Sequence, residues 1–546
     1  MTKKKGDLFT SKMLMLYAGH EDLLHEIVND RERYEQDDDN SEEVLHIHKL
    51  LHIYDMYQET RVRDKDIAIS LYATCLWYIH QYINPPEIQY TELDERGNLR
   101  LLYDVIIDHL IKKYMIISAN DCIYIYIDSM YYEDRGRIEK DINKILKQGG
   151  YSRTRKITEI VREIMKRIKA ETMKFKEFPF NKKAQYMVPV RNGVVVRKQL
   201  NMLMPKSPVW GFTYSLQVDY NPDAPTEPID KFLHDIVSEE DAGILVQAVA
   251  QALLQNENYQ LSYLLTGQGA NGKSTYISLV TTLLGMENIT AISIQDLIED
   301  KFKAAELQGK LMNLYADLPK TSLKTTGQFK ILTGGDTMVV EKKFHQPFKM
   351  INKAVFVFSA NELPEVNDAT FAFWRRWAVI DFPHKFKNDP TFKDRLMTDE
   401  NISGFLNMVI AKMDEIEERG IHRSDKVEEI MQAWQKRSNS AFAFISETIV
   451  RDVGGFIPKE VLWSEYQMYC KANDFTPVSK VAFKSEIERN GGIEEQRQVN
   501  KVRVRGFTGI RRVTDPPSES EIALRKKQDT TKATMLIFDE EDEQDK

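Results

Sequence analysis

Residues 267–274 read Gly267-Gln268-Gly269-Ala270-Asn271-Gly272-Lys273-Ser274 and fit the phosphate-binding pattern GxxxxGK(S/T) at every fixed position. An apolar, strand-like run at 261–265 precedes this loop, and apolar residues at helical spacing follow it as far as Leu284. In this order, strand, glycine loop and helix let backbone N–H groups surround phosphate oxygens at the positive end of a helix. The stretch therefore predicts a nucleotide-binding core built on a P-loop within an α/β fold.

The side chains of the loop have distinct expected roles toward ATP and Mg²⁺, the expected cofactors. Lys273 is expected to reach the β and γ phosphates, and the Ser274 hydroxyl is expected to ligate Mg²⁺. The residues predicted to hold the nucleotide are Gly267, Gly269, Asn271, Gly272, Lys273, Ser274 and Thr275.

Length and composition indicate a globular protein of several domains. The 546 residues suffice for roughly three to four domains, and 42% of them are hydrophobic and 29% charged. The three cysteines are too widely spaced for a disulfide framework or a zinc site. No apolar run approaches the ~18 residues of a membrane span, and the basic N-terminus lacks an apolar signal core. We therefore expect a protein that does not enter a membrane and stays in the cytoplasm.

Changes in residue pattern divide the chain into six segments. A basic amphipathic helix is predicted at 156–169, and short strands are predicted at 188–196 and 214–220. The six segments are a helical and irregular region at 1–95, a mixed region at 96–235, the nucleotide-binding motor at 236–390, a helical connector at 391–437, a small domain at 438–513 and an acidic tail at 514–546.

Further motifs follow the P-loop within the motor. One apolar stretch ends in Asp317, placed where a P-loop ATPase needs a carboxylate for Mg²⁺ or its water. A second apolar run leads to Asn361, and the adjacent pair Arg375 and Arg376 comes next. Between Asp317 and Asn361, a basic and aromatic cluster consists of Lys342, Lys343, Phe344 and His345.

This ordered set of motifs resembles the superfamily 3 helicases, specifically the branch of phage and plasmid replication proteins related to the poxvirus primase-helicase, over about residues 100–512. The resemblance implies a P-loop core of the AAA+ type, with Asn361 as the sensor of the γ-phosphate or of the attacking water. It also implies that Arg376, with Arg375 as the alternative, reaches the ATP of a neighbouring subunit. The basic and aromatic cluster matches the family's pore hairpin, which grips single-stranded DNA.

The chain departs from many motor ATPases at the strand-end acid. Those proteins place a second acidic residue beside the first, whereas Asp317 is flanked by Ala316 and Leu318. Asp317 is thus the sole carboxylate of this motif. Whether it acts on the metal, on the attacking water or on both stays open.

The small domain at 438–513 concentrates positive charge. Helices at 459–473 and 479–490 precede a ribbon of alternating valines and cations, a pattern that resembles the winged-helix domain after the motor in the same family. A net charge of −8 therefore does not exclude a nucleic-acid partner, although a solvated basic face is the competing interpretation. The expected DNA contacts are Lys480 and Lys484 on the recognition helix and Arg497, Lys501, Arg503 and Arg505 on the ribbon.

Together these features favour an ATP-dependent replicative DNA helicase of a phage, plasmid or related mobile element. By resemblance it works as a ring, a homo-hexamer, that translocates on single-stranded DNA and unwinds forked DNA, with residues 96–235 as part of the oligomerisation collar or of its link to the motor. A primase-helicase is the nearest alternative, although residues 1–95 are few for a catalytic priming domain. A second alternative is an origin-binding initiator whose ATPase drives assembly. The apolar and acidic stretch at 535–543 is expected to be disordered or to dock a replication-protein partner.

Overall fold

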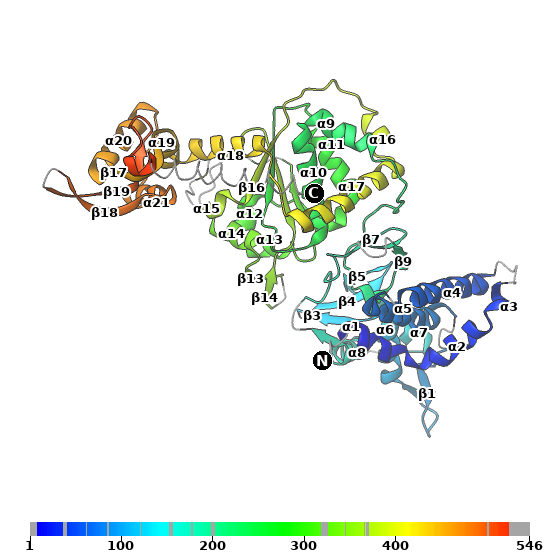
Figure 1. The fold of residues 1–546 in the computed structure, drawn as a ribbon. Helices are drawn as coiled ribbons and strands as arrows, with labels where there is room; N and C mark the ends of the chain where they lie inside the picture. The colour runs from blue at the N-terminus through cyan, green and yellow to red at the C-terminus, as the bar shows by residue number, and fades with distance from the viewer. Residues whose placement is uncertain are drawn as a thin grey trace, which may run out of the picture.

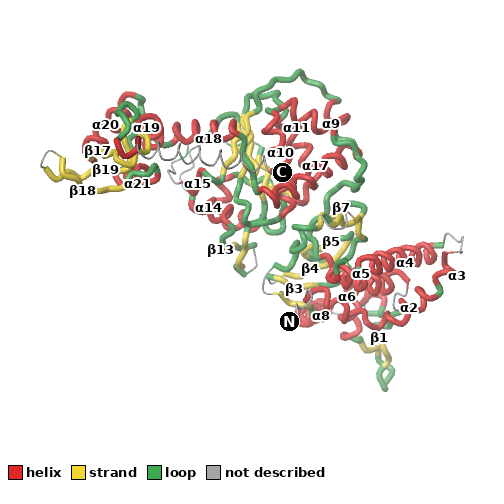
Figure 2. The backbone as a smooth tube through the Cα atoms, viewed as in Figure 1, coloured by secondary structure: helices red, strands yellow, loops and turns green. Residues whose placement is uncertain are grey.

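The computed structural model describes residues 8–35, 41–61, 63–83, 87–120, 122–151, 157–175, 178–197, 202–316, 318, 326–343, 346–364, 366, 371–499 and 502–522. Figure 1 shows three parts in chain order: an N-terminal region, a central α/β unit, and a small C-terminal domain that helix α18 (Asp425–Ser438) joins to the centre. Figure 2 marks helices and strands along the same path. The described ranges leave out the tail beyond residue 522 and four predicted site residues, which are Asp317, Phe344, His345 and Lys501.

Helices occupy most of the described N-terminal region. α4 (Glu42–Thr60) and α5 (Lys65–Tyr78) pack against each other, and Leu71 lies fully buried in their core. Ser41 and Asp64 precede these helices, and their side chains accept hydrogen bonds from first-turn N–H groups. The shorter elements are α1 (Leu8–Tyr17), η1 (Ala18–His20), α2 (Glu21–Asn29), α3 (Arg31–Glu35) and η2 (Ile79–Ile83).

A four-stranded sheet, here called the N-terminal sheet, follows in the order β5-β4-β3-β6. Three helices form a separate apolar core with it, in which Ile106, Ile138 and Ile164 are fully buried. The basic helix predicted at 156–169 is present as α8. The elements are β1 (Thr91–Leu93), β2 (Leu99–Leu101), α6 (Tyr103–Tyr114), β3 (Ile117–Ala119), β4 (Cys122–Ile127), β5 (Met130–Glu133), α7 (Arg137–Gln148), α8 (Ile157–Glu171) and β6 (Met173–Phe175).

Two strand predictions in the next segment are corrected by the structure. The strand predicted at 188–196 is a hairpin, and the stretch 214–220 is not a strand. Residues 214, 215, 216 and 218 are buried, and the Leu216 N–H donates to the Pro189 carbonyl at 2.9 Å. Proline has no N–H to return a hydrogen bond, so a regular ladder does not form there. The hairpin elements are β7 (Met187–Val190), β8 (Gly193–Val196) and β9 (Met202–Met204), with the turn η3 (Pro208–Trp210) after them.

The central unit contains a five-stranded parallel sheet in the order β11-β12-β15-β10-β16. Every residue of β10 and β15 is buried, as expected for parallel strands covered on both faces. This sheet agrees with the predicted α/β core. Its strands are β10 (Ser262–Thr266), β11 (Ile289–Thr290), β12 (Met312–Tyr315), β15 (Val355–Ala360) and β16 (Trp377–Asp381). The other elements are α9 (Glu227–Ile236), α10 (Glu239–Leu254), α11 (Lys273–Leu284), η4 (Met286–Asn288), α12 (Ile294–Glu299), α13 (Lys301–Ala305), α14 (Gly327–Gly334), β13 (Thr337–Val340), β14 (Phe348–Ile351) and α15 (Phe371–Trp374).

The segment predicted as a helical connector contributes to the central core. It contains α16 (Phe392–Leu396) and α17 (Asp399–Arg419), and α17 packs along α10 with Phe405 and Met413 fully buried. The buried Arg197 of the hairpin region donates to Asp414 and Glu417 of α17, which ties the N-terminal region to the centre. None of the helices in the described chain has both the length and the apolar character required to cross a membrane.

The C-terminal domain contains two elements that the sequence patterns did not reveal. Helix α19 (Ser440–Thr448) and strand β17 (Ile449–Pro458) precede the two predicted helices, which the structure places at α20 (Lys459–Ala472) and α21 (Lys480–Arg489). β18 (Ile493–Val499) and β19 (Val502–Arg512) form the predicted ribbon, and β17 joins it in the order β17-β19-β18. The glycine pair at 454–455 obscured the apolar alternation of β17.

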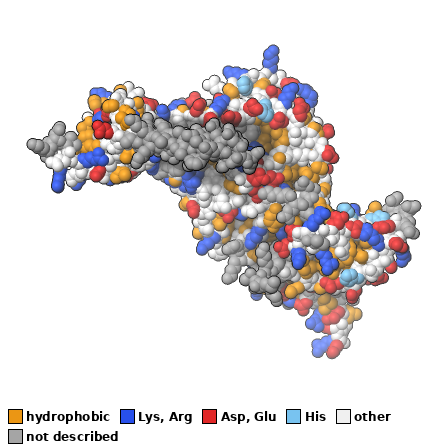
Figure 3. Space-filling model, viewed as in Figure 1, with side chains coloured by type: hydrophobic (Ala, Val, Ile, Leu, Met, Phe, Trp, Pro, Cys, Tyr) orange, Lys and Arg blue, Asp and Glu red, His pale blue; other side chains and the backbone are white. Residues whose placement is uncertain are grey.

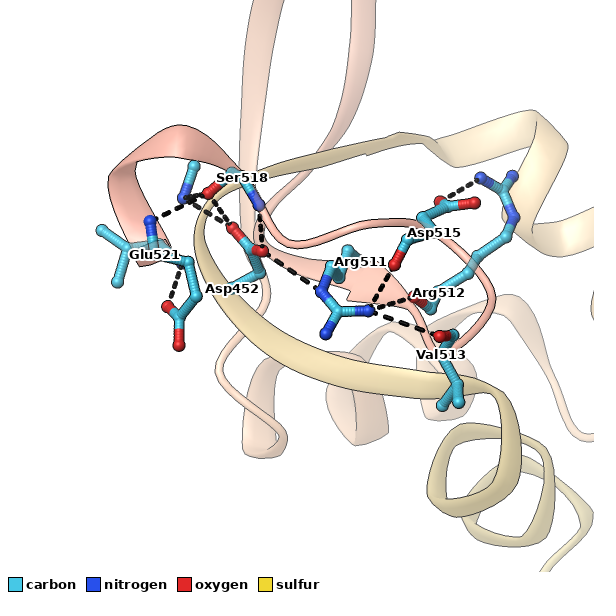
Figure 4. A network of polar contacts seen from close by, with 9 residues as sticks. Asp452, Arg511, Arg512, Val513, Asp515, Ser518 and Glu521 are labelled. Atoms are coloured by element: carbon cyan, nitrogen blue, oxygen red, sulfur yellow. Dashed lines mark hydrogen bonds and ion pairs between the residues drawn. The ribbon is translucent and has the colours of Figure 1, made fainter. Parts of the chain in front are cut away.

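A polar network secures the residues after β19 to an irregularity in β17 (Figure 4). The buried carboxylate of Asp452 accepts from the Ser518 backbone N–H at 2.8 Å and from the Gly454 N–H at 3.0 Å, and it pairs with Arg511 at 3.2 Å. Burial opposes ionisation of Asp452, but these hydrogen bonds outweigh it and lower the pKa of the carboxyl group. The network continues the fold of the domain beyond residue 513, the predicted boundary.

Candidate nucleotide and nucleic-acid sites

The P-loop lies at the C-terminal edge of the parallel sheet, directly after β10. Thr266, the last residue of β10, pairs with Ala360 of β15 on one side and with Asp381 of β16 on the other. Ligands of open α/β sheets bind at this edge, because loops and helix N-termini converge there. Gly267 and Asn361 each follow a member of the Thr266–Ala360 pair, so the fold brings the predicted sensor beside the P-loop.

The glycines of the loop serve different purposes. Gly272 has a φ of +91°, and a Cβ there would lie 2.4 Å from the Cγ2 of Ile236. Gly267 has a φ of +140°, and a Cβ there would lie 2.6 Å from the Phe382 carbonyl oxygen. A Cβ on Gly269 would meet no described atom within 4 Å. Packing therefore requires glycine at 267 and 272, whereas the space at Gly269 is open to a ligand.

Lys273 begins α11 with its side chain folded over the loop. The residue is 7% exposed, and its Nζ donates to the Gly267 carbonyl. Burial lowers the pKa of the Lys273 ammonium, while the charge of Asp381 acts in the opposite direction. Sequence reasoning did not single out Asp381, because it lies far along the chain from the loop.

Asn271 fixes the loop to the end of β16. Its Nδ2 donates to the Phe382 carbonyl at 3.4 Å, and the Phe386 N–H donates to the Ala270 carbonyl at 2.8 Å. The N-cap of α11 is Gly272, which has no side chain to occupy the first-turn N–H groups, and Ser274 is exposed. A positive helix end, an adjacent lysine and an exposed hydroxyl fit a phosphate group with its Mg²⁺. The Thr275 N–H, also predicted to hold nucleotide, already donates to the Gly272 carbonyl at 3.0 Å.

The Mg²⁺-binding acid predicted from the sequence, Asp317, lies outside the described residues. Its neighbours place the end of β12 near the site: Tyr315 pairs with Phe358, and the Leu318 N–H donates to the Ser359 carbonyl at 2.7 Å. Because β15 separates β12 from β10, this end of β12 lies two strand spacings from the P-loop strand, about 10 Å. The side chain of Asn361 is exposed.

The two candidate finger arginines lie at the opposite edge of the sheet. The Ser262 N–H, at the start of β10, donates to the Arg376 carbonyl at 2.7 Å. The length of β10 therefore separates this pair from the P-loop of the same chain, about 13 Å at the usual rise per residue. Arg375 is exposed and donates to the Gln260 side chain at 2.7 Å.

Arg376 is much less accessible than Arg375. It is 6% exposed, and its guanidinium donates to the Ala372 carbonyl. Burial and the charge of Arg375 lower the pKa of Arg376, and Asp336 opposes this effect. The sequence could not decide which of the two adjacent arginines is the finger. In the structure Arg375 is accessible to a second molecule, whereas the side chain of Arg376 is nearly buried.

The predicted pore hairpin is a real antiparallel hairpin. β13 and β14 pair from Thr337 with Ile351 to Val340 with Phe348, and Lys343 is exposed in the connection. Lys342 instead pairs with Glu133 of the N-terminal sheet at 2.6 Å. Sequence reasoning missed this partner, which lies 209 residues away along the chain.

The cations of the C-terminal domain divide into two groups. Arg503 and Arg505 are exposed and form no ion pair with any residue in the described ranges. Arg497 donates to Thr508, contacts the Phe456 ring and pairs with Glu495 at 3.3 Å. The described part of the ribbon therefore offers two cations without an ion-pair partner.

The predicted recognition helix carries paired lysines. Lys480 lies 3.7 Å from Glu460, and Lys484 pairs with Glu488 at 3.5 Å and with Glu494. On the face drawn in Figure 3, basic and acidic side chains are likewise interspersed. Glu494 lies just before the basic stretch that the sequence emphasised, so its compensating charge was not recognised.

Three family descriptions match separate parts of the chain. Residues 103–238 match "D5 N terminal like", residues 265–376 match "Family of unknown function (DUF5906)", and residues 436–507 match "Poxvirus D5 protein-like". The matched ranges cover the N-terminal sheet, the P-loop with its following motifs, and the C-terminal domain in turn.

Two viral proteins are similar to parts of the chain. The chain is 25% identical over 249 residues to "Putative helicase L207/L206" of Acanthamoeba polyphaga mimivirus, which covers 41% of this chain and 26% of that protein. It is 26% identical over 168 residues to "Putative helicase 121R" of Invertebrate iridescent virus 3, with 28% and 18% covered. The chain thus spans about a quarter or less of the length of these relatives.

The solved structure "The A form apo structure of NrS-1 C terminal region-CTR" aligns with 74% of this chain and 98% of that chain, at 13% identity and a TM-score of 0.41. A second apo structure of the same region gives the same values. The two D5 matches and the helicase-named viral relatives support a relationship of the chain to the phage/poxvirus-like primase-helicase family.

Proposed function

We propose that this chain is the ATP-driven motor of a replicative DNA helicase from a virus, phage or mobile element, with an AAA+ core of the superfamily 3 type. The observation that carries the proposal is the P-loop at the sheet edge, where buried Lys273 lies over the loop and the N-cap residue of α11, Gly272, has no side chain that could occupy the phosphate position. The helicase names of the viral relatives support DNA as the substrate on which this ATPase acts.

Each residue of the site has a task in this proposal. Lys273 and the first turn of α11 bind the phosphates, and Asn361 orients the γ-phosphate or the attacking water. Ser274 and Asp317 would hold Mg²⁺, which neutralises phosphate charge when bound. Asp381 keeps a negative charge near Lys273 and so favours its ammonium form.

The placement of the finger candidates supports a ring of subunits. Because Arg375 and Arg376 lie at the far edge of the sheet, neither serves the P-loop of its own chain, and a neighbouring subunit must bring one of them to the ATP. Exposure favours Arg375 for this role, since Arg376 is nearly buried. A homo-hexamer is the proposed assembly.

The proposed DNA contacts are the hairpin, which grips the translocated strand, and a winged-helix domain at the C-terminus. Lys343 is exposed at the hairpin connection, and Arg503 and Arg505 are exposed on the ribbon. In this arrangement the ribbon contributes more to duplex binding than α21, whose lysines already face glutamates.

The first test replaces the P-loop lysine. Lys273→Ala should lower ATP hydrolysis by at least about tenfold and abolish unwinding of a forked DNA, because a charged contact to the transferring phosphate is lost. Circular dichroism should show an unchanged fold. ATPase above a tenth of the wild-type rate would refute the assigned contact. Wild-type ATPase without unwinding of any fork would favour an origin-binding initiator.

The second test separates hydrolysis from DNA movement. Lys343→Ala should abolish unwinding and leave DNA-independent ATPase near the wild-type rate, because β13 and β14 lie on the side of the central unit away from α11, the helix that follows the P-loop (Figure 1). Lys349→Ala, on β14 of the same hairpin, is the matched control and should retain unwinding. Equal loss of both activities in Lys343→Ala would place this residue in the ATP site or in the fold instead.

A further inference from the structure

Helix α8 presents a basic stripe that the nucleotide and hairpin sites do not use. Arg162, Lys166 and Lys169 follow one another at spacings of four and three residues, which places them on one face of the helix. Arg162 and Lys166 are exposed. Lys166 forms no ion pair with any residue that the structure describes. Arg167, by contrast, is paired with Asp104 and Glu171 on another face.

A cavity of about 380 Å³ opens beside this stripe, between α8 and the strands β3 and β6. Lys166 and Lys169 line it together with Ser118, Asn120 and Phe175, and no described lining residue is acidic. We call it the α8 pocket. Its volume lies within the range of small-ligand sites, and its lining combines positive charge, hydroxyl and amide groups, and one aromatic ring.

Asn120 adds an independent sign of a ligand. It occupies the left-handed region with a φ of +49° after β3, and its Nδ2 is buried without a hydrogen-bond partner in the described chain. An unpaired buried amide donor is unfavourable unless something supplies an acceptor. A phosphate oxygen entering the pocket would be such an acceptor.

The N-terminal sheet connects this pocket to the pore hairpin. Glu133, which pairs with Lys342 of the hairpin, lies in one row with Tyr124, Ile117 and Met173 across the four strands. β5 and β6 are the two edges of this sheet, about 14 Å apart at the usual strand spacing. A single extended strand of nucleic acid can reach from the hairpin to the pocket over such a distance.

We propose that the α8 pocket binds a phosphate and the adjoining base of the single-stranded DNA that leaves or enters the hairpin. Lys166 and Lys169 attract the phosphate, Asn120 donates to it, and Phe175 contacts the base; cations with an aromatic ring are the usual means of holding a single strand without regard to sequence. This inference rests on the proposed helicase function, and it adds a contact outside the motor.

The test compares two charge reversals in the full-length chain. Lys166→Glu should weaken binding of an oligo-dT of about 30 nucleotides by about threefold to tenfold and reduce the slope of log affinity against log salt by about 0.7 for each lost contact. Binding of an oligo-dT of about 6 nucleotides, enough for one site only, should change much less. Lys140→Glu on the exposed face of α7 is the matched control and should have little effect on either oligonucleotide.

Cross-linking provides a readout that general charge repulsion would not produce. The three natural cysteines are buried, so a photoreactive label attaches selectively to Lys166→Cys or to the control Lys140→Cys. DNA cross-links from the first position and not from the second are expected. Equal behaviour of the two positions in both assays would overturn the pocket proposal. If wild-type protein hydrolyses ATP and unwinds DNA, that failure concerns the pocket alone; if it does neither, the helicase proposal itself fails.

Discussion

Gly272 shows how one residue of the P-loop is constrained by packing rather than by the ligand. Gly272→Ala places a methyl group 2.4 Å from Ile236 at a φ of +91°, so α9 or the loop must move. We expect a lower melting temperature for the nucleotide-free protein, with an unfolding free energy reduced by about 1–3 kcal/mol.

Gly269→Ala is the matched comparison within the same loop. Gly269 also has a positive φ, +43°, but its Cβ meets no described atom within 4 Å, so only the backbone strain remains and the nucleotide-free melting temperature should fall by less than in Gly272→Ala. A methyl group at this open position should instead diminish the stabilisation that added Mg·ATP provides, because it occupies the space next to the phosphates. Thermal unfolding with and without Mg·ATP distinguishes the two variants. Identical behaviour of both would contradict the distinct roles assigned to these glycines.

At the scale of single residues, local sequence patterns predicted which residues lie in a loop, strand or helix. They did not predict which distant residues those side chains contact. The spacing of Gly267, Gly272 and Lys273 predicted a loop between strand and helix, which the structure contains. Asp381 and Glu133 were missed because they approach Lys273 and Lys342 only through the fold. A charge pair between distant segments leaves no periodic signal in either one.

At the scale of elements, α20 and α21 begin within one residue of the predicted helices, because apolar residues at helical spacing and the Ser479 cap are local signals. The strand predicted at 214–220 was wrong for the opposite reason. Its apolar residues Tyr214, Leu216 and Val218 are buried, but a ladder depends on the neighbouring segment, and Pro189 cannot supply the N–H.

The junction of α20, α21 and β18 should make the C-terminal domain sensitive to acid. Hydrogen bonds from Lys459 and Lys484 lower the pKa of Glu494 to about 2. The folded form therefore holds this carboxylate ionised at pH values where the unfolded chain, with a pKa of about 4.3, binds a proton. The resulting stability is complete above the unfolded pKa and is lost as the pH falls toward 2.

Glu494→Gln tests this linkage. At pH 7 the variant should unfold at a lower temperature than the wild type, and the difference should shrink as the pH falls from about 4.3 toward 2, where both side chains are uncharged. Scanning calorimetry of the full-length chain at several pH values measures the difference. Glu460→Gln, with Lys480 at 3.7 Å, is a control expected to show a smaller effect. A difference independent of pH would contradict the assigned ion pairs.

At the scale of the whole molecule, the two halves of the proposed catalytic site lie on opposite edges of one sheet. The P-loop follows the last residue of β10, while Arg375 and Arg376 lie beside its first residue. Under the proposed function, one chain carries two half-sites that face different neighbours, and a closed ring is the arrangement that would satisfy all of them. The order of the P-loop and the arginine pair along the chain is visible in the sequence. Their position at opposite edges of the sheet is not, because it follows from the parallel pairing of β10 and β16.

Mixing inactive variants tests this arrangement directly. Arg375→Ala and Lys273→Ala should each lack ATPase activity, and their mixture should recover part of it, because an interface between the two variants can combine an intact P-loop with an intact finger. Arg376→Ala with Lys273→Ala is the parallel comparison. It should recover less activity and unfold at a lower temperature, since Arg376 is nearly buried and donates to the Ala372 carbonyl.

The comparison between the two arginines determines which one acts across the interface. Recovery with Arg376→Ala alone would assign the finger to Arg376, as the motif order first suggested, and would require its side chain to leave the buried position seen here. Arg395→Ala, on exposed α16, controls for general loss of a positive charge and should keep full activity by itself. If native mass spectrometry shows mixed rings and neither mixture regains ATPase, the shared site is refuted. An active protein that remains monomeric at every concentration would refute the ring as well.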